Sequence, residues 1–258
     1  MEESQETRTA LVTGAGGGMG REIARLLLAR GVRVGLADVN AEGIAETAAG
    51  SESQTLALAG DLTVEGAAEK TVQAVTDTWG RFDILVNNAG YGVIESFLDS
   101  TYASWQRTFG INVMALALLT TAAGRRMKAA GSGRIVNITS PASRMALPNY
   151  AAYSASKAAV DSITRAAAVA LAPFGVQVNS VAPGMMDTEM QRSTEATMAR
   201  LEGRSDIDTF LAERTARIPV GRRAEIAEVA NAVVWLALDA PDYMVAERLN
   251  MSGGLDKD

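Results

Sequence analysis

The chain has 258 residues, 48% of them hydrophobic and 21% charged, which is enough for one large α/β domain or two small ones. Its formal net charge of −6 and its scattered arginines disfavour a nucleic-acid surface, because phosphate binding needs clustered Lys and Arg. The sequence contains no cysteine and no histidine, which excludes disulfides, thiolate nucleophiles, a Ser-His-Asp triad and most zinc sites, so we expect no bound metal.

Apolar runs of strand length alternate with helical patterns along the chain. Strands are predicted at residues 9–13, 32–37, 54–59, 83–86, 134–138, 176–181 and 248–251. Helices are predicted at 19–30, 41–49, 64–79, 105–129, 151–171 and 226–238. Strict alternation with continuously apolar strands indicates a parallel sheet covered by helices on both faces. No linker divides the chain, so residues 1–258 are predicted to form a single α/β domain with a doubly wound, seven-stranded sheet of the Rossmann type.

Residues 185–218 interrupt this alternation. The segment is long, polar and helical, and it follows the strand at 176–181. An insertion at the carboxyl end of a strand is where a substrate lid would sit. Five apolar side chains stand among its polar ones: Met185, Met186, Met190, Met198 and Phe210. They could line a pocket, although such residues at helical spacing also serve in ordinary packing.

A glycine-rich run, TGAGGGMG at residues 13–20, joins the first predicted strand to the first helix. Glycines let the backbone turn sharply and approach a phosphate, and the following helix N-terminus offers free N–H groups to a pyrophosphate. The alternative is a loop that merely needs positive φ angles. Its place at the first β–α junction favours dinucleotide binding.

Asp38 ends the second predicted strand, 18 residues after Gly20. A carboxylate there can accept hydrogen bonds from both hydroxyls of the adenosine ribose and would repel a 2′-phosphate. No basic residue follows it, and position 17 is glycine. This favours NAD over NADP, unless Asp38 is only a turn residue at the end of a strand.

The stretch YSASK places Tyr153 four residues before Lys157 on a predicted helix, so both side chains share one face. A free tyrosine has a pKa of about 10, too high for an efficient base near neutrality. An adjacent ammonium favours the phenolate, so we expect Lys157 to lower the pKa of Tyr153. Tyr150 lacks such a lysine, because Ser154 stands four residues after it. A buried aromatic near a surface lysine is the structural alternative.

Seven motifs occur in order: TGAGGGMG, Asp61-Leu62, NNAG at 87–90, Asn112, Ser140, YSASK and PGMMDT at 183–188. With this order the chain resembles the short-chain dehydrogenase/reductase family from about residue 8 to residue 254. The resemblance implies an enzyme that transfers hydride between a small-molecule alcohol or ketone and NAD(P).

The resemblance also implies which residues hold the dinucleotide. The pyrophosphate turn would comprise Thr13, Gly14, Gly18, Met19 and Gly20. The adenine edge would be held by Asp61 and Leu62. The strand end beside the adenosine ribose would comprise Asn88, Ala89 and Gly90, although Asn87 and Asn88 could be partly structural. The segment over the nicotinamide would comprise Pro183, Gly184, Met186 and Thr188, with Thr188 near the carboxamide or the phosphates, while Tyr153 and Lys157 would also face the cofactor.

The implied catalytic residues are Asn112, Ser140, Tyr153 and Lys157. Ser140, 13 residues before Tyr153, would hydrogen-bond the substrate oxygen and stabilise charge developing on it. Ser143 is a nearby alternative outside the motif. Asn112 would hold a water against the lysine, or would mark only a local irregularity, because Asn is a poor helix former.

The resemblance leaves the substrate open. Residues 241–254 look like the C-terminal region of polyol and diol dehydrogenases, although Ser252 replaces a common aspartate and Val245-Ala246 a common Thr-Gly. We therefore expect a sugar alcohol or vicinal diol, with reduction of a 3-oxoacyl thioester as the alternative. The lid has five arginines but seven acidic residues from Asp187 to Glu213, which favours neither. A non-catalytic NAD-binding regulatory protein is a further possibility, because fold does not determine function.

The remaining expectations concern assembly and location. The alanine-rich helix at 151–171 and the helix at 105–129 pair across a two-fold axis in the family, which implies a homotetramer, with a dimer second. The first eight residues are polar and unlike a signal peptide, and no apolar run reaches transmembrane length. We therefore expect a cytoplasmic protein with no membrane or nucleic-acid partner.

Overall fold

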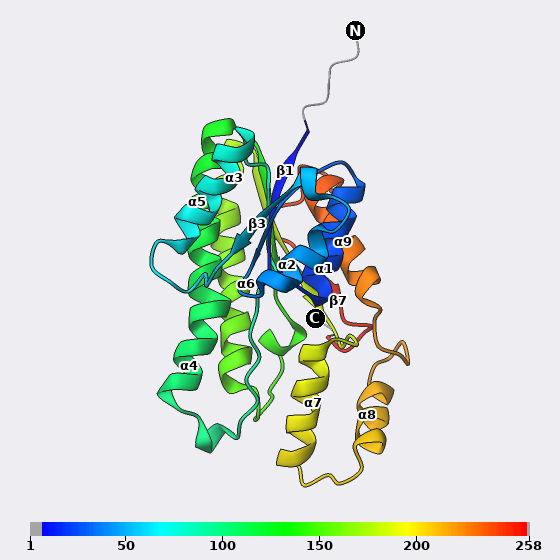
Figure 1. Cartoon of the computed structure of the whole chain (residues 1–258). Coiled ribbons are helices and arrows are strands. Elements are labelled where there is room, and N and C mark those ends of the chain that lie inside the picture. Colours follow the sequence, from blue (N-terminus) through cyan, green and yellow to red (C-terminus); the bar gives the residue numbers. More distant parts are fainter. Residues whose placement is uncertain (1–6, 257–258) are drawn as a thin grey trace.

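Seven parallel strands form one sheet in the computed structural model, which describes residues 7–256 (Figure 1). Residues 1–6 and 257–258, the ends of the predicted domain, lie outside the described residues. The strands are β1 (Thr9–Thr13), β2 (Arg33–Asp38), β3 (Thr55–Ala59), β4 (Ile84–Asn87), β5 (Gly133–Ile138), β6 (Val176–Pro183) and β7 (Arg248–Met251). Their order is β3-β2-β1-β4-β5-β6-β7. The order reverses between β1 and β4, so a crevice opens there at the carboxyl ends of the strands.

Helices cover both faces of the sheet, and each face has its own apolar core. Ala10 and Val12 of β1 pack with α1 (Gly18–Ala29), α2 (Ala41–Ala48) and α9 (Ile226–Leu238). Leu11, between them, points to the opposite face, which carries α3 (Ala67–Trp79), α5 (Leu116–Ala130) and α6 (Ala151–Leu171). This confirms the predicted doubly wound α/β fold. Within residues 7–256 no helix is both long enough and apolar enough to cross a membrane.

The long helix predicted at 105–129 is interrupted. The chain forms α4 (Tyr102–Phe109), a π-helical turn η3 (Gly110–Ala115) and then α5. The turn contains Asn112, and it displaces the helical register at this residue. The helix predicted from residue 64 begins instead at Ala67, because Gly66 before it is left-handed at φ 78°. Four short 3-10 turns complete the connections: η1 (Glu52–Gln54), η2 (Phe97–Asp99), η4 (Pro141–Ser143) and η5 (Ala172–Phe174).

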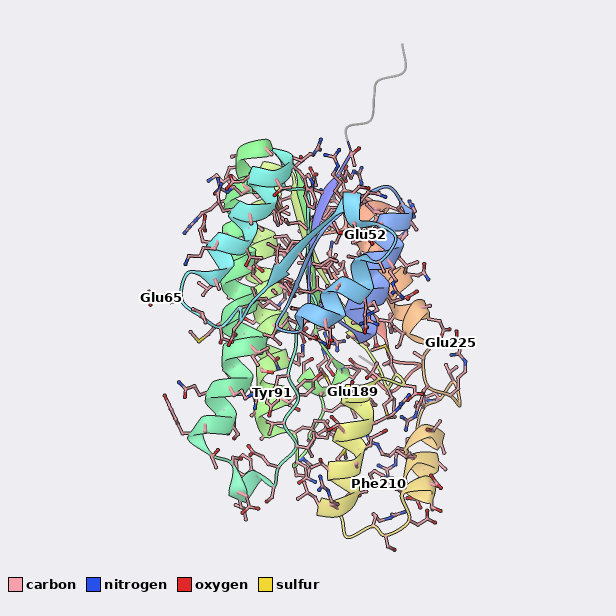
Figure 2. The ribbon with its side chains drawn as sticks, viewed as in Figure 1. Glu52, Glu65, Tyr91, Glu189, Phe210 and Glu225 are labelled. Atoms are coloured by element: carbon pink, nitrogen blue, oxygen red, sulfur yellow. The ribbon has the colours of Figure 1, made fainter. Side chains whose placement is uncertain are left out.

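The segment predicted as a lid forms two helices, α7 (Glu189–Leu201) and α8 (Ile207–Ala216), which project beyond the carboxyl ends of the strands (Figure 1). Thr188 caps α7, and Asp206 caps α8 by accepting the amide hydrogen of Thr209. Phe210 lies between the two helices and packs with Met198 and Ala199 in a small separate core (Figure 2). The lid is thus held together by its own contacts.

Candidate active site

A cavity of about 570 Å³ opens at the carboxyl ends of the strands, between the sheet and the lid. The residues around it come from the turn after β1, the ends of β2, β4, β5 and β6, the start of α6, and both lid helices. Fifteen of the site residues expected from the sequence line it: Gly14, Gly18, Met19, Gly20, Asp38, Asn88, Ala89, Gly90, Ser140, Tyr153, Lys157, Pro183, Gly184, Met186 and Thr188. The segments predicted to hold a dinucleotide and those predicted to react therefore share one space.

Four expected site residues do not line this cavity. Thr13 is buried, and its Oγ1 accepts the amide hydrogens of Asn88 at 3.0 Å and Ala89 at 2.9 Å, so it anchors the loop after β4 to β1. Asp61 is exposed, and its carboxylate accepts hydrogen bonds from the amide and the hydroxyl of Thr63. Leu62 packs against the core beside α3 and α5. Asn112 is the fourth. The structure assigns Thr13 a supporting position, while the adenine contacts of Asp61 and Leu62 stay predictions.

The glycine-rich turn has the shape that an anion requires. Gly17 caps α1 without any side-chain hydrogen bond, so the first amides of this helix lack an acceptor from a capping residue. Gly18 has φ 50°, and a Cβ on it would meet nothing within 4 Å, so the backbone there is open to the cavity. A Cβ on Gly20 would lie 2.0 Å from the carbonyl oxygen of Gly14, so only glycine permits this packing of helix against turn. These residues fit a pyrophosphate.

Asp38 is half-buried at the end of β2 and faces the cavity. Its Oδ2 accepts the amide hydrogen of Gly16 at 2.9 Å, and its Oδ1 accepts that of Asn40 at 2.9 Å. The carboxylate is therefore fixed beside the glycine-rich turn, where a ribose would meet it. The turn role considered for Asp38 is real, because the carboxylate bonds Asn40 two residues later, but it leaves acceptor capacity on both oxygens.

Tyr153 and Lys157 both reach the cavity from the first two turns of α6, as their spacing predicted. The Lys157 ammonium lies 5.7 Å from the centre of the Tyr153 ring and donates to the carbonyl oxygen of Ile138 at 2.9 Å. Ser140, at the end of β5, hydrogen-bonds the Tyr153 hydroxyl. The hydroxyls of a serine and a tyrosine and a buried ammonium thus converge in one place.

The pKa values of this pair differ from the sequence-based expectation. Burial raises the pKa of Tyr153, although the hydrogen bond from Ser140 partly opposes this. Burial lowers the pKa of Lys157 to about 8, while the charge of Asp161 opposes the shift. The expected lowering of the pKa of Tyr153 is therefore not found, because desolvation of the buried phenol is the largest effect on it and raises its pKa.

The two alternative residues have other partners. The Ser143 hydroxyl donates to Asp161 Oδ2 at 2.6 Å. The Tyr150 hydroxyl contacts the sulfur of Met198 at 2.9 Å, and burial raises the pKa of Tyr150 to about 12. Neither group is arranged as a proton acceptor, so Ser140 and Tyr153 remain the candidates.

Asn112 lies just behind the cavity wall, 1% exposed, in the π-helical turn. Its Oδ1 accepts the amide hydrogen of Tyr91, and its Nδ2 donates to the carbonyl oxygen of Tyr91 and to Ser156 Oγ, both at 2.9 Å. A Cβ on Gly90 would lie 3.7 Å from both Asn112 Oδ1 and the Lys157 ammonium, so the two groups flank the same glycine. The helix irregularity at Asn112 is therefore confirmed, while a water held by Asn112 against Lys157 stays a prediction.

A buried charge network behind the site was missed in the sequence. Asp161, four residues after Lys157, lies 3.6 Å from Arg248 of β7. Arg248 pairs with Asp256 at 2.7 Å and donates to the carbonyl oxygen of Ser140 at 3.0 Å. The i, i+4 spacing from Lys157 to Asp161 was the available signal. Arg248, the partner of Asp161, is distant in sequence, so no local pattern indicates their contact.

The lid contains a second buried cluster that sequence reasoning missed. Glu195 of α7 is 1% exposed, and its carboxylate accepts hydrogen bonds from Arg214 of α8 at 3.1 Å and from Arg223 at 2.9 and 3.0 Å. Burial raises the pKa of Glu195, but hydrogen bonds from Arg223, Gln191 and Arg214 outweigh it, and the pKa is lowered. The cluster ties both lid helices to the segment that leads into α9.

The apolar lid residues have divided roles. Met185, Met186, Met190 and Met198 line the cavity, while Phe210 belongs to the lid core. Met198 does both, because it also packs with Phe210. The two interpretations left open by the sequence therefore both hold, and Met198 combines them.

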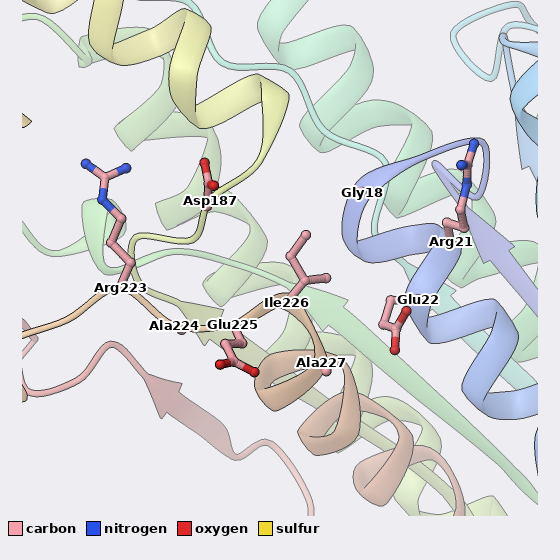
Figure 3. A pocket seen from close by; sticks show the side chains of 9 residues that line it. All are labelled: Gly18, Arg21, Glu22, Asp187, Arg223, Ala224, Glu225, Ile226 and Ala227. Carbon is pink, nitrogen blue, oxygen red and sulfur yellow. The ribbon is translucent and has the colours of Figure 1, made fainter.

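A second cleft, of about 530 Å³, adjoins the first at Gly18 (Figure 3). It lies between the starts of α1 and α9, with Arg21 and Glu22 on one side and Asp187 and Arg223 on the other (Figure 3). The charges that line this second cleft are mixed, and the side chains of Ser140, Tyr153 and Lys157 line the first cavity. We therefore place any reaction in the first cavity.

Comparison with known proteins agrees with this geometry. A family model described as enoyl-(acyl carrier protein) reductase matches residues 14–256. The sorbitol dehydrogenase of Cereibacter sphaeroides is 35% identical over 250 residues, 96% of each chain. The cis-4-hydroxycyclohexanecarboxylate dehydrogenase of Sinomonas cyclohexanicum is 37% identical over 257 residues, 98% of each chain. A crystal structure of actinorhodin polyketide ketoreductase with NADPH matches with a TM-score of 0.93 and 32% identity, covering 99% of each chain.

The chain belongs to the short-chain dehydrogenase/reductase family. It is an oxidoreductase similar to polyol dehydrogenases, and a nicotinamide dinucleotide is the cofactor that membership supports.

Two departures from the family pattern lie near β7. Ala246, where a glycine is common, has φ 64°, the one left-handed non-glycine backbone among residues 7–256. Ser252, where an aspartate is common, is buried, and its Oγ accepts the amide hydrogen of Asp256 at 3.1 Å. A Cβ on Gly184 would lie 2.8 Å from the Cα of Ser252, so this chain end packs directly under the cavity wall. Ser140, Tyr153 and Lys157 are present despite these departures.

Proposed function

We propose that this oxidoreductase transfers hydride between a secondary alcohol and NAD at a site formed by Ser140, Tyr153 and Lys157. The observation that carries the proposal is the convergence of these three side chains in a cavity that also contains the glycine-rich turn. A proton acceptor, a hydrogen-bond donor and a cation are the groups that alcohol oxidation requires.

The choice of NAD rests on Asp38. The uncapped N-terminus of α1 and the open backbone at Gly18 fit a pyrophosphate, and Asp38 beside them would bond the ribose hydroxyls. A phosphate on that ribose would meet a fixed carboxylate. The actinorhodin ketoreductase was solved with NADPH, so the cofactor preference of this chain has to be measured rather than taken from its neighbours.

The residues of this chain supply binding, polarisation and proton transfer. Bound NAD would accept the hydride from the alcohol carbon. Tyr153 Oη takes the alcohol proton, and the Ser140 hydroxyl donates a hydrogen bond to the same oxygen as charge develops on it. Lys157 would hold the nicotinamide ribose. Asn112 would complete a path by which the proton reaches solvent beside Gly90.

The raised pKa of Tyr153 and the lowered pKa of Lys157 have a consequence for this step. A phenol with a raised pKa keeps its proton near neutral pH, so Tyr153 is in the protonated form that can donate to the oxygen of a ketone during reduction. The direction of flux would then follow from the supply of oxidised and reduced cofactor.

For the substrate, a sugar alcohol or vicinal diol is our first proposal, supported by the likeness to sorbitol dehydrogenase. Reduction of a 3-oxoacyl thioester is the second candidate, favoured by the close match to a polyketide ketoreductase. A non-catalytic NAD-binding role is disfavoured because all four proposed catalytic residues are present. The two matched dehydrogenases are named for the alcohols sorbitol and cis-4-hydroxycyclohexanecarboxylate, and the second of these alcohols also bears a carboxylate.

An assay of NAD and NADP reduction with polyols, vicinal diols and 3-hydroxyacyl esters would test the proposal. Turnover with NAD on a polyol or diol is the expected result. Turnover only on the acyl esters would support the second candidate. Tight NAD binding without turnover on any alcohol would instead favour a regulatory protein.

We also propose that the chain is one dinucleotide-binding and catalytic domain with a lid, that it assembles as a homotetramer, with a dimer second, and that it is cytoplasmic. Exposed apolar side chains support the assembly: Met114 and Leu118 along η3 and α5 are 60% and 51% exposed, and Val169 of α6 is 73% exposed. Such side chains suit an interface between copies. Light scattering coupled to size exclusion would measure the mass, and a monomer would contradict this proposal.

A further inference from the structure

The five lid arginines, which in the sequence favoured no substrate class, separate in the structure. Arg192 pairs with Asp187 at 2.8 Å, and Arg204 pairs with Glu213 at 2.8 Å. Arg200 is exposed and bonds only to a nearby threonine among the described residues. None of these three lines the cavity. Most acidic charge in the lid is therefore used in ion pairs and helix caps.

The other two, Arg214 and Arg217, line the cavity. Arg214 shares the carboxylate of Glu195 with Arg223, on which the charge of Asp187 also acts from beyond ion-pair distance. Arg217 is exposed, and among residues 7–256 no carboxylate comes within ion-pair distance of it, since Glu213 acts on it only from further away. The lid side of the cavity therefore has an excess of positive charge.

One acidic lid residue, Glu189, also lines the cavity, in the first turn of α7 (Figure 2). Its charge acts on Arg192. Among residues 7–256 no ion pair joins Glu189 to Arg214 or Arg217.

Tyr150 connects this charge to the proposed reaction centre. Its hydroxyl hydrogen-bonds with Arg214, and its ring lies 6.1 Å from the ring of Tyr153. Met185, Met190 and Met198 form the neighbouring wall. A molecule whose alcohol is at Tyr153 would thus pass an apolar wall before it meets the guanidinium groups.

We propose that the substrate is a secondary alcohol, or the matching ketone, that also bears a carboxylate, and that Arg214 and Arg217 bind that carboxylate. This inference rests on the proposed function. Guanidinium groups suit carboxylates, because their planar N–H groups can bond both oxygens. The inference narrows the alcohols proposed above to those that also carry a carboxylate, because an uncharged polyol leaves the positive charge without a partner. An oxo or hydroxy acid with a short apolar chain fits both the positive charge and the methionine wall.

The test compares matched substrates in the reduction direction. The chain is given NADH with 4-oxopentanoate, 5-oxohexanoate or 6-oxoheptanoate, and with the methyl ester of each. Charge-assisted hydrogen bonds predict that kcat/KM for the best acid exceeds that for its ester by about tenfold or more. The best chain length also reports how far the carboxylate lies from Tyr153.

Arg217→Gln provides the decisive variant, because Arg217 is exposed and its loss leaves the buried cluster of Glu195 intact. We expect it to lower kcat/KM for the acid severalfold or more and to leave the ester unchanged. Arg200→Gln, in the same lid but away from the cavity, is the control and should change neither. Equal kcat/KM for acid and ester, or an equal loss of both in Arg217→Gln, would overturn the proposal.

Failure of the inference and failure of the proposed function give different results. Equilibrium binding of the acid and the ester to the Tyr153→Phe variant with NADH measures recognition without turnover. If the variant binds the acid more tightly than the ester while the unmodified protein turns over no substrate, the carboxylate site stands and the proposed function is removed. If the unmodified protein turns over esters and acids equally well, the proposed function stands and the carboxylate site is removed. The protein could instead prefer a 3-oxoacyl-CoA over every acid and lose that preference in Arg217→Gln. Arg217 would then bind a phosphate, and the proposal of a substrate carboxylate would be overturned.

Discussion

The wall formed by β5 and α6 and the lid formed by α7 and α8 face the same cavity but are built differently. The wall presents Ser140, Tyr153 and Lys157 on a strand end and the start of a 21-residue helix, with Lys157 only 4% exposed. The lid is joined by one buried carboxylate, Glu195, and a small apolar core. The wall is therefore fixed by the sheet itself, and the lid by a few contacts of its own.

This difference separates chemistry from selection. Under the proposed function, the wall would supply, on rigid elements, the groups that any alcohol needs, and the lid would supply the charged and apolar groups that distinguish one alcohol from another. Changes to the wall should therefore remove the reaction for all substrates. Changes to the lid should alter which substrates react.

The largest effect is expected for Tyr153→Phe. Without its hydroxyl the wall has no proton acceptor in reach of the alcohol, so kcat should fall about a thousandfold for every substrate. The dissociation constant for NAD, measured by fluorescence titration, should change little, because the ring is retained. Tyr102→Phe is the control, since Tyr102 is exposed at the start of α4 and does not line the cavity. Turnover by Tyr153→Phe near the unmodified rate would show that the wall does not carry the chemistry.

The next effect is expected for Glu195→Gln in the lid. Removing this charge leaves the half-buried Arg214 and Arg223 without their carboxylate. The loss of one partner in comparable buried pairs lowers the free energy of unfolding by about 3 kcal/mol. Hydrogen exchange of amides in α7 and α8 should become faster, while amides of β5 keep their protection. Equal loss of protection in both regions would mean that the lid and the wall unfold as one unit.

Much of the wall could be predicted from sequence, because its signals are local. The bounds of α6 at 151–171 follow from a long apolar pattern, and the approach of Tyr153 to Lys157 follows from their spacing on one helix. The continuously apolar run of β1 likewise predicts a sheet buried on both faces, and its residues do pack against both cores. The fold as a whole follows from such local patterns repeated along the chain.

The failures have a common physical cause, which is that they depend on contacts between distant segments. The π-helical turn around Asn112 is set by bonds to Tyr91 and Ser156, and no periodicity reveals them. The raised pKa of Tyr153 reflects burial that only the assembled wall creates. The ion pairs of Glu195 join α7 to residues far along the chain.

A smaller effect is expected for Asp38→Asn, at the nucleotide end of the cavity. The amide keeps the shape of the side chain but removes the charge that would bond the ribose and repel a phosphate. The ratio of kcat/KM for NAD to that for NADP should fall roughly tenfold to a hundredfold. Glu65→Gln, an exposed carboxylate distant from the turn, is the matched control. An unchanged ratio would mean that cofactor choice is made elsewhere.

The smallest effect is expected for Asp161→Asn, which tests how the network behind the wall supports Lys157. The pKa of Lys157 is about 8, because burial lowers it while the charge of Asp161 raises it. If catalysis needs the ammonium, kcat/KM for ketone reduction falls as pH rises through that value. Removing the negative charge lowers the pKa of Lys157 further, so the fall should move to lower pH.

Ser143→Ala separates this charge effect from packing. The substitution removes the hydroxyl that donates to Asp161 at 2.6 Å but keeps the carboxylate, so the fall in activity should stay close to its original pH. A merely structural role for Asp161 would lower activity at every pH and leave the profile in place. A shift in Asp161→Asn alone would show that Asp161 acts on Lys157 through its charge and is a positioning residue for the wall.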